Sequence, residues 1–272
     1  MRLATVTNGR FFFNAVNLIN SYKINSFDEE VLFFGFDLTD EHYSYLKHKY
    51  GDQVRAEEIE NVCSHAKDPR LFFYKVYAIK KSMDAGEDFL YLDAAHEIVR
   101  PTTELKKDIS ERDGRLIIPY GSEMLKNKHW VAKKCFEKTG CDSERYREAS
   151  QYAAGIQAWE FSSEHQAFVD EMYELMMDVE IAGPPPHHQY PDGPSSSCIE
   201  HRQDQSVFSL LITKYGFGQE FDVDIAQKYG DQQTLIGPFN EGSSYVPDPS
   251  RTVIEIRKTK FADYSLLELS PS

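Results

Sequence analysis

The sequence predicts an α/β protein in which a central, mostly parallel sheet is flanked by helices; the alternation of its segments favours this class, and its length and composition bound the size of the core. Short apolar segments alternate with helical patterns through the first half of the chain, an order typical of parallel strands covered by helices on both faces. The 272 residues, 41% of them hydrophobic and 27% charged, are enough to bury a large core in one domain, although two domains remain open.

The predicted strands of the first half are short apolar runs, at residues 2–7, 31–36, 54–57, 88–93 and 116–119. Helical patterns separate them, at residues 11–21, 41–50, 69–84 and 103–112. Pro69 opens the third of these helices because proline fits the first helical turn, with Asp68 as its cap and Gly86 near its end.

The second half is less regular. Helical patterns occupy residues 126–139, 163–179 and 202–215, the last ended by Gly216, and strands are predicted at residues 151–159 and 252–256. Residues 183–197 form a loop, since their prolines and serines sustain neither a helical nor a strand period. The loop is rich in aromatic and histidine residues, so we expect a lid or a binding loop rather than a domain boundary.

Composition narrows the function classes. The net charge of −14 argues against non-specific binding to nucleic acid, because no general basic field attracts phosphates. The cysteines Cys63, Cys135, Cys141 and Cys198 lack the spacing of zinc sites, so we expect reduced thiols. No apolar run approaches the ~18 residues of a membrane-spanning helix, and no signal-peptide core forms at the N-terminus. We therefore expect a cytosolic protein without an integral membrane segment.

Asp93 and Lys75 are the first candidates for chemistry. Asp93 ends the predicted strand at residues 88–93, and ligands of open α/β sheets bind beyond the carboxyl ends of strands; a turn cap is the alternative. Lys75 lies beside the apolar stripe of the helix at residues 69–84. It could extend to solvent, or it could reach a phosphate over the sheet edge, with Arg70 one turn earlier.

Asp204 is a candidate because it shares a helical face with apolar residues, namely Val207, Phe208, Leu211 and Tyr215. An inward carboxylate needs a partner or a cleft, since burying it alone costs several kcal/mol. A cap at the positive end of the helix is the alternative. Arg202 and His201 directly precede this helix; Arg202 could bind a phosphate with two hydrogen bonds, or both residues could be exposed.

Three segments together resemble the GT-A nucleotide-sugar glycosyltransferases, particularly the glycogenin-like ones. In residues 73–95 a lysine lies one helix upstream of the run Leu92-Asp93-Ala94-Ala95, where that family has Leu-Asp-Ala-Asp. Residues 151–159 resemble the small-residue strand of these proteins, and residues 200–211 resemble their Asp-Gln helix start. The runs Gly155-Ile156-Gln157 and His201-Arg202-Gln203-Asp204-Gln205 also resemble glycosyltransferases of large algal and giant viruses. The segments follow the family's order.

The resemblance implies one Rossmann-like GT-A domain over residues 1–272, with a nucleotide-binding half at 1–125 and an irregular acceptor-side half at 126–272. It implies transfer of a sugar from a nucleoside diphosphate sugar to a glycan or glycoside acceptor. The expected donor is a UDP-sugar, with xylose or a hexose as the sugar. The sequence does not indicate an oligomeric state.

The patterns and the resemblance together assign residues to three roles. The expected catalytic residues are Asp204, Asp93 and Arg202. The expected donor-binding residues are Thr5, Thr7, Asn8, Arg70, Lys75, Asp93, Ala94, Ala95, Gly155, Gln157, His201, Arg202 and Gln205. The expected acceptor contacts are Trp159, His187, His188 and Tyr190, which offer stacking faces beside the loop at residues 183–197.

The metal site that the resemblance implies is incomplete. GT-A proteins hold Mn²⁺ or Mg²⁺ with two motif aspartates and often a late histidine, whereas here Ala95 replaces the second aspartate and no histidine follows His201. Either Asp93 and His96 hold a cation, which would be a poor site for a hard ion, or no metal binds. In the second case cationic side chains balance the leaving-group charge, drawn from Lys75, Arg202, Arg70 and Arg100.

Two other functions remain open. A sugar nucleotidyltransferase shares this architecture but usually carries a glycine-rich signature after its first strand, and residues 7–10 are too sparse in glycine. A catalytically silent module that binds a sugar nucleotide or glycan is the second. The glycogenin-like wording favours a retaining reaction, whereas a base at Asp204 would suit inversion.

Overall fold

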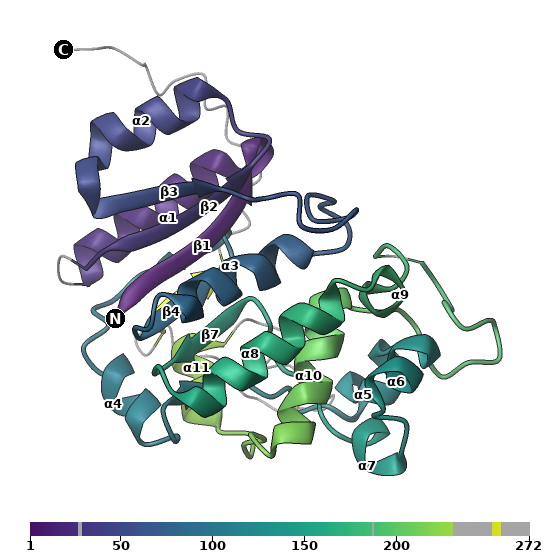
Figure 1. Cartoon of the computed structure of the whole chain (residues 1–272). Helices are drawn as coiled ribbons and strands as arrows, with labels where there is room; N and C mark the ends of the chain where they lie inside the picture. The colour runs from purple at the N-terminus through teal and green to yellow at the C-terminus, as the bar shows by residue number, and fades with distance from the viewer. Residues whose placement is uncertain (27–28, 187, 231–251, 257–272) are drawn as a thin grey trace.

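The computed structural model describes residues 1–26, 29–186, 188–230 and 252–256, and a six-stranded sheet runs through this part of the chain (Figure 1). The strands lie in the order β3 (Val54–Glu58), β2 (Val31–Phe36), β1 (Arg2–Asn8), β4 (Phe89–Leu92), β7 (Ile156–Trp159) and β6 (Arg115–Leu116). The pairs β3–β2, β2–β1 and β1–β4 are parallel, whereas β7 is antiparallel to both of its neighbours. The prediction of a mostly parallel sheet is confirmed.

Helices cover both faces of this sheet. One core contains Ala4 of β1 and packs under α3 (Phe73–Asp84), α8 (Ser163–Met176) and α10 (Gln203–Tyr215). The other contains Leu3 and packs under α1 (Phe12–Asn25), α2 (Asp40–Tyr50), α4 (Leu105–Ser110) and α11 (Val223–Tyr229). Strands buried on both faces read as continuous apolar runs, which explains why the sequence shows them so clearly.

The helix predicted from Pro69 begins later, at Phe73. The Asp68 carboxylate accepts a hydrogen bond from the main-chain N–H of Arg70 at 2.9 Å, which forms a turn instead of a helix cap. Phe72 then adopts φ of 58°, a left-handed conformation that a helix cannot contain. The prediction for the start of this helix was therefore wrong, whereas its end at Asp84 is confirmed.

The second half departs further from the predictions. The helix predicted at 126–139 is divided into α5 (Asn127–Trp130) and α6 (Lys133–Thr139), because Val131 is extended. The helix at 163–179 ends with α8, and α9 (Val179–Ala182) follows it. The strand predicted at 151–159 is a regular strand only in β7.

Strand β8 (Ile254–Ile256) confirms the predicted strand of the tail. It pairs with β5 (His96–Ile98), a strand that was not predicted. Helices α7 (Glu144–Arg147) and α11 were also missed.

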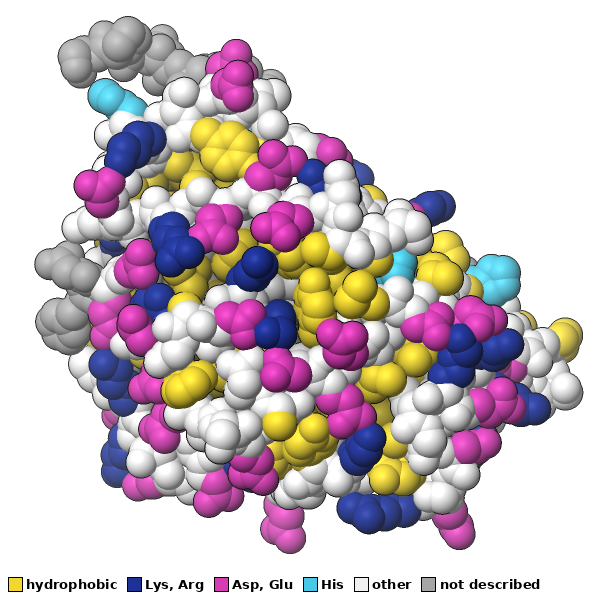
Figure 2. Space-filling model, viewed as in Figure 1, with side chains coloured by type: hydrophobic (Ala, Val, Ile, Leu, Met, Phe, Trp, Pro, Cys, Tyr) yellow, Lys and Arg dark blue, Asp and Glu magenta, His cyan; other side chains and the backbone are white. Residues whose placement is uncertain are grey.

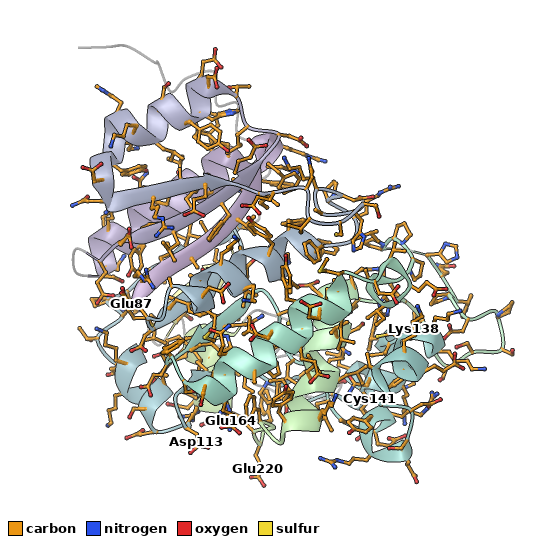
Figure 3. The ribbon with its side chains drawn as sticks, in the orientation of Figure 1. Glu87, Asp113, Lys138, Cys141, Glu164 and Glu220 are labelled. Carbon is orange, nitrogen blue, oxygen red and sulfur yellow. The ribbon has the colours of Figure 1, made fainter. Side chains whose placement is uncertain are left out.

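The surface carries the negative charge. Figure 2 shows acidic side chains mixed with lysines and arginines over one face, and in Figure 3 the labelled carboxylates Glu87, Asp113, Glu164 and Glu220 lie at the periphery. The four cysteines are free thiols, as predicted. Among the described residues, no helix combines the length and the apolar character needed to cross a membrane.

Candidate active site

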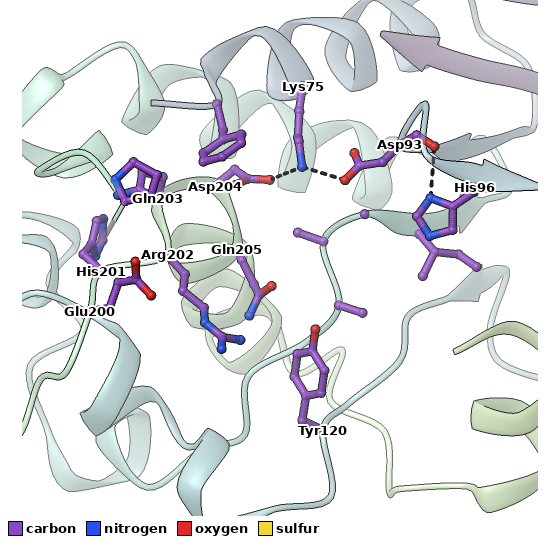
Figure 4. A pocket seen from close by; sticks show the side chains of 16 residues that line it. Lys75, Asp93, His96, Tyr120, Glu200, His201, Arg202, Gln203, Asp204 and Gln205 are labelled. Carbon is purple, nitrogen blue, oxygen red and sulfur yellow. Dashed lines mark hydrogen bonds and ion pairs between the residues drawn. The ribbon is translucent and has the colours of Figure 1, made fainter. Parts of the chain in front are cut away.

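A pocket of about 330 Å³ opens where the carboxyl end of β4 meets the N-terminal ends of α3 and α10 (Figure 4). Lys75 of α3, Asp93 after β4 and Asp204 of α10 all line it. The Lys75 Nζ lies 2.7 Å from Asp93 Oδ2 and 4.0 Å from Asp204 Oδ2. One ammonium group therefore joins two carboxylates that are more than a hundred residues apart in sequence.

Asp93 is held on both carboxylate oxygens. Oδ2 pairs with Lys75, and Oδ1 accepts a hydrogen bond of 2.9 Å from the hydroxyl of Tyr91. Burial raises the pKa of Asp93, but the Lys75 ammonium, His96 and the Tyr91 hydroxyl together outweigh burial, so the pKa lies below its ordinary value. Asp93 is therefore an ionised carboxylate with fixed partners.

Gly155 allows this close packing. Its carbonyl accepts a hydrogen bond from the main-chain N–H of Asp93 at 2.9 Å. A Cβ at this position would lie 2.8 Å from Asp93 Oδ2, closer than van der Waals contact allows. The small residue predicted at this position is therefore required by Asp93 itself. Ala94 and Ala95, two further predicted donor contacts, lie half-buried in the turn that follows and do not line the pocket.

Lys75 is shaped by the start of α3. Its Nζ lies 4.9 Å from the centre of the Phe72 ring, a cation–π distance, and the left-handed backbone of Phe72 positions that ring. Burial lowers the pKa of Lys75, but the charges of Asp93 and Asp204 more than compensate and raise it above its ordinary value. Lys75 is therefore charged at neutral pH.

Asp204 differs from Asp93. It is 6% exposed and lies in the first turn of α10, above the fully buried Val207, Phe208 and Leu211, so the inward face predicted from the sequence is confirmed. Burial raises the pKa of Asp204 from 3.8 to about 6; Lys75 opposes this shift and the charge of Asp93 adds to it. The residue before it, Gln203, has φ of 36°, a strained conformation of the kind concentrated at functional sites.

Arg202 and His201 both line the pocket but serve different ends. The Arg202 guanidinium carbon lies 3.8 Å from the centre of the Trp130 ring, which holds the group by a cation–π contact. His201 is 1% exposed, and its ring nitrogens lie within hydrogen-bond distance of the Ala132 N–H and the Ile181 carbonyl. Burial lowers its pKa to about 4, so the His201 imidazole is neutral at neutral pH, and both of its ring nitrogens have partners within the protein.

The structure does not bring four other predicted donor contacts to the pocket. Thr5 is fully buried and donates its hydroxyl to the Leu92 carbonyl at 2.7 Å. The Thr7 hydroxyl donates to the main-chain carbonyl of Asn8, whose own side chain caps the turn at Phe11. Arg70 is exposed and paired with Asp68. These side chains bond other groups of the protein, at the end of β1 and in the turn before α3.

Two residues of β7 also lie away from the pocket. Trp159 is fully buried among aromatic rings, 5.2 Å from Phe168, and it pairs with Phe89 at the start of β4, the edge opposite the pocket. The prediction of Trp159 as an acceptor contact is therefore not supported. Gln157 is 1% exposed, and its amide bonds the Ala154 carbonyl and the Trp159 indole N–H.

The loop at 183–197 approaches the pocket through Pro186. His187 lies outside the described residues. His188 and Tyr190 are exposed, Tyr190 to 49%, and neither lines the pocket. They stay candidates for an acceptor that extends beyond it.

Several pocket residues were missed from the sequence, namely Phe72, Tyr120, Glu200 and Gln203, and so was the hydroxyl of Tyr91. Tyr91 stands two residues before Asp93, so strand alternation places both on one face. Tyr120 directly follows a predicted strand, at the same kind of edge as Asp93. Both signals were available in the sequence.

Comparison with known proteins identifies the fold. No protein-family model and no curated protein sequence matches the chain. Mouse xyloside xylosyltransferase 1 in its apo form is similar over 95% of this chain and 97% of its own, with a TM-score of 0.56 and 10% identity. The galactosyltransferase LgtC with donor and acceptor sugar analogues is similar over 96% and 88%, with a TM-score of 0.52 and 11% identity. The bifunctional glycosyltransferase WbbM, apo form, matches 94% of this chain and 45% of its own, with a TM-score of 0.52 and 9% identity.

This chain has the GT-A glycosyltransferase fold. The residues that resemble the metal motif of this family do not fit a divalent cation. Both oxygens of Asp93 are engaged, and Ala95 offers no carboxylate where the resembling motif has its second aspartate. His96 Nδ1 lies 3.0 Å from the Asp93 main-chain carbonyl. The groups at this position that could bind a metal are therefore the His96 imidazole and the Asp93 carboxylate, whose charge is balanced by Lys75. Mg²⁺ and Mn²⁺ prefer several oxygen ligands, and no cluster of three or more His, Cys, Asp or Glu side chains suited to a metal occurs in the described residues.

Proposed function

We propose that this protein is a glycosyltransferase that moves a sugar from a nucleoside diphosphate sugar to a glycan or glycoside acceptor. The observation that carries the proposal is the joint position of Lys75, Asp93 and Asp204 in one pocket at the carboxyl edge of a GT-A sheet. We propose a UDP-sugar as the donor, with xylose or a hexose. The similar solved structures include a xylosyltransferase and a galactosyltransferase, which supports sugar transfer without choosing between these sugars.

In this proposal cations of the chain replace the metal ion. The diphosphate leaving group gains negative charge as the sugar departs, and preorganised positive groups stabilise that charge. Lys75 is charged and faces the pocket, and Arg202 lies across it on Trp130. An arginine and a lysine suit phosphate oxygens as a fork and a point charge, respectively.

Asp204 is the residue that we propose for proton transfer. A carboxylate with a pKa of about 6 is ionised at neutral pH, yet its affinity for protons is higher than that of an ordinary aspartate. It can therefore accept a proton from a hydroxyl group that enters the pocket. Asp93, fully paired, is suited to holding Lys75 and the sugar hydroxyls in place rather than to proton transfer.

A silent sugar-nucleotide-binding module is the second candidate, and a specific observation favours it. The carboxylate of the motif position is neutralised by Lys75 inside the protein, so the site could bind a donor without catalysing its cleavage.

Hydrolysis and transfer assays with UDP-, GDP- and CDP-sugars, each with and without EDTA, distinguish the candidates. Transfer that persists in EDTA supports the proposal. Donor binding without turnover would favour the silent module, and pyrophosphate release from a nucleoside triphosphate would favour a nucleotidyltransferase. Absence of binding for every nucleotide would refute the donor site altogether.

A further inference from the structure

The side chain of Gln205 is the pocket end of a chain of amides that begins outside the pocket. Its Nε2 donates a hydrogen bond of 2.9 Å to Oε1 of Gln151. Gln151 in turn donates from Nε2 to Oδ1 of Asn127 at 2.7 Å, and Asn127 donates from Nδ2 to the main-chain carbonyl of Tyr146 at 2.9 Å. Gln151 and Asn127 are both fully buried.

The direction of this chain follows from its last member. A main-chain carbonyl can only accept a hydrogen bond, so Asn127 must turn its NH₂ group toward Tyr146. Its carbonyl oxygen then faces Gln151, which must donate to it and can only accept from Gln205. Reversing the amide of Asn127 or Gln151, which are both fully buried, would oppose two like groups away from solvent, at about 1–3 kcal/mol for each unsatisfied group.

Main-chain hydrogen bonds hold the residues of this amide relay, Asn127, Gln151 and Gln205, in place. The N–H groups of Asn127 and Gln151 donate to the carbonyls of Ala149 and Leu125 at 2.9 and 2.8 Å, respectively. On the other side, the Gln205 N–H donates to the Arg202 carbonyl at 2.9 Å. Main-chain hydrogen bonds therefore fix the backbone at both ends of the relay, and the side-chain hydrogen bonds orient its amides.

We propose that Gln151 and Asn127 are positioning residues for the donor sugar, because they turn the carbonyl oxygen of Gln205 toward the pocket. Figure 4 shows the Gln205 amide among the residues that line the pocket, with Lys75, Asp93 and Asp204 nearby. Its oxygen accepts a hydrogen bond from a sugar hydroxyl, a group that can always donate. The sugar contact rests on the proposed function, whereas the amide orientation is a property of the protein without ligand.

The orientation is tested without any ligand. The side-chain NH₂ signal of Gln205 in ¹H–¹⁵N spectra is assigned by its loss in Gln205→Glu. We expect its hydrogens to exchange with solvent slowly in the wild type and at least about tenfold faster in Gln151→Met, which keeps the length of the side chain but removes the acceptor. Equal exchange rates in the two proteins would overturn the relay.

The sugar contact is tested by comparing UDP with a UDP-sugar, using whichever of UDP-xylose, UDP-glucose and UDP-galactose binds the wild type. Gln151→Met is expected to weaken the UDP-sugar about tenfold and to leave UDP unchanged. Gln151→Glu is expected to restore affinity at low pH, because a protonated carboxyl can donate to Asn127 and accept from Gln205. A merely structural role would weaken both ligands equally.

Thr139→Val supplies the matched control. The buried Thr139 hydroxyl donates to the Cys135 carbonyl at 2.7 Å on α6, away from the pocket lining. The variant loses a buried hydrogen bond, as Gln151→Met does, and should leave the ratio of UDP-sugar to UDP affinity at its wild-type value. An equal effect of Gln151→Met on both ligands overturns the sugar contact. If no UDP-sugar binds the wild type, the proposed function and the sugar contact fail together, and the exchange result still decides the relay.

Discussion

The two sides of the pocket hold their carboxylates in opposite ways. On the β4 side, Asp93 has an ammonium and a hydroxyl as partners at 2.7 and 2.9 Å, and its pKa is lowered. On the α10 side, Asp204 lies 4.0 Å from the same ammonium and is more deeply buried, and its pKa is raised to about 6. Environments that separate the pKa values of two nearby carboxylates are the pattern by which sites divide binding from proton transfer. The comparison assigns the holding role to the β4 side and the reactive role to the α10 side.

Removing the shared cation should have the largest effect. Lys75→Met leaves two carboxylates in one pocket without their counter-ion, so we expect a loss of about 3 kcal/mol in unfolding free energy and a fall in transfer rate of at least about 10³-fold. Urea unfolding and initial-rate assays measure the two quantities.

Lys80→Met is the control for this substitution. Lys80 lies on the same helix and is ion-paired with Asp84 and with Asp170, but it does not line the pocket. It should retain the wild-type rate. Equal rates for Lys75→Met and the wild type would contradict the role given to the ammonium.

Asp204→Asn should lower the transfer rate by about 10²-fold, since it removes a proton acceptor. It also has a signature in stability. The pKa of Asp204 is higher in the folded protein than in the unfolded chain, so folding is favoured by its proton at low pH, and that stability is lost as pH rises through about 6. The wild type should therefore lose about 2 kcal/mol relative to Asp204→Asn between pH 4 and pH 7, as measured by urea unfolding.

Asp93→Asn should show the opposite result: the unfolding free energy of the wild type relative to this variant should rise with pH. The pKa of Asp93 is lowered on folding, so its contribution is present above the ordinary value of 3.8 and disappears as pH falls through the folded pKa. Parallel pH profiles for the two variants would remove the distinction between the two sides of the pocket.

Gly155→Ala should have a smaller effect. A methyl group 2.8 Å from Asp93 Oδ2 must displace that carboxylate, and we expect transfer to fall about tenfold with a folded protein. Gly114→Ala is the control, because its methyl would meet Glu160 Oε2 at the same 2.8 Å outside the pocket lining. That variant should lose stability through its positive φ but keep its rate per folded molecule; a rate loss equal to that of Gly155→Ala would show that displacing Asp93 is not the cause.

The sequence predicted the parts of this site that depend on local periodicity. Strand ends and helical faces located Asp93, Lys75 and Asp204, because an apolar run ends at the first residue and an apolar stripe flanks the other two. The same reasoning failed for Trp159, whose place depends on the antiparallel direction of β7, and for Thr5, whose hydroxyl is taken by a neighbouring strand.

The periodicity of the sequence could not predict where helices begin or which distant side chains meet. The late start of α3 depends on the left-handed backbone of Phe72, a residue type that rarely adopts it. The pairing of Gln151 with Gln205 spans more than fifty residues, and nothing in either segment alone signals it. Such contacts follow from the packing of whole elements rather than from a pattern in one of them.

Calorimetric titration of UDP into the wild type and Lys75→Met, in EDTA and in Mn²⁺, tests the central claim that the chain supplies its own cation. The account predicts that the wild type binds UDP equally well in both buffers and that Lys75→Met in EDTA binds at least about tenfold more weakly. Binding by the wild type only when Mn²⁺ is present, with Lys75→Met unaffected, would contradict it.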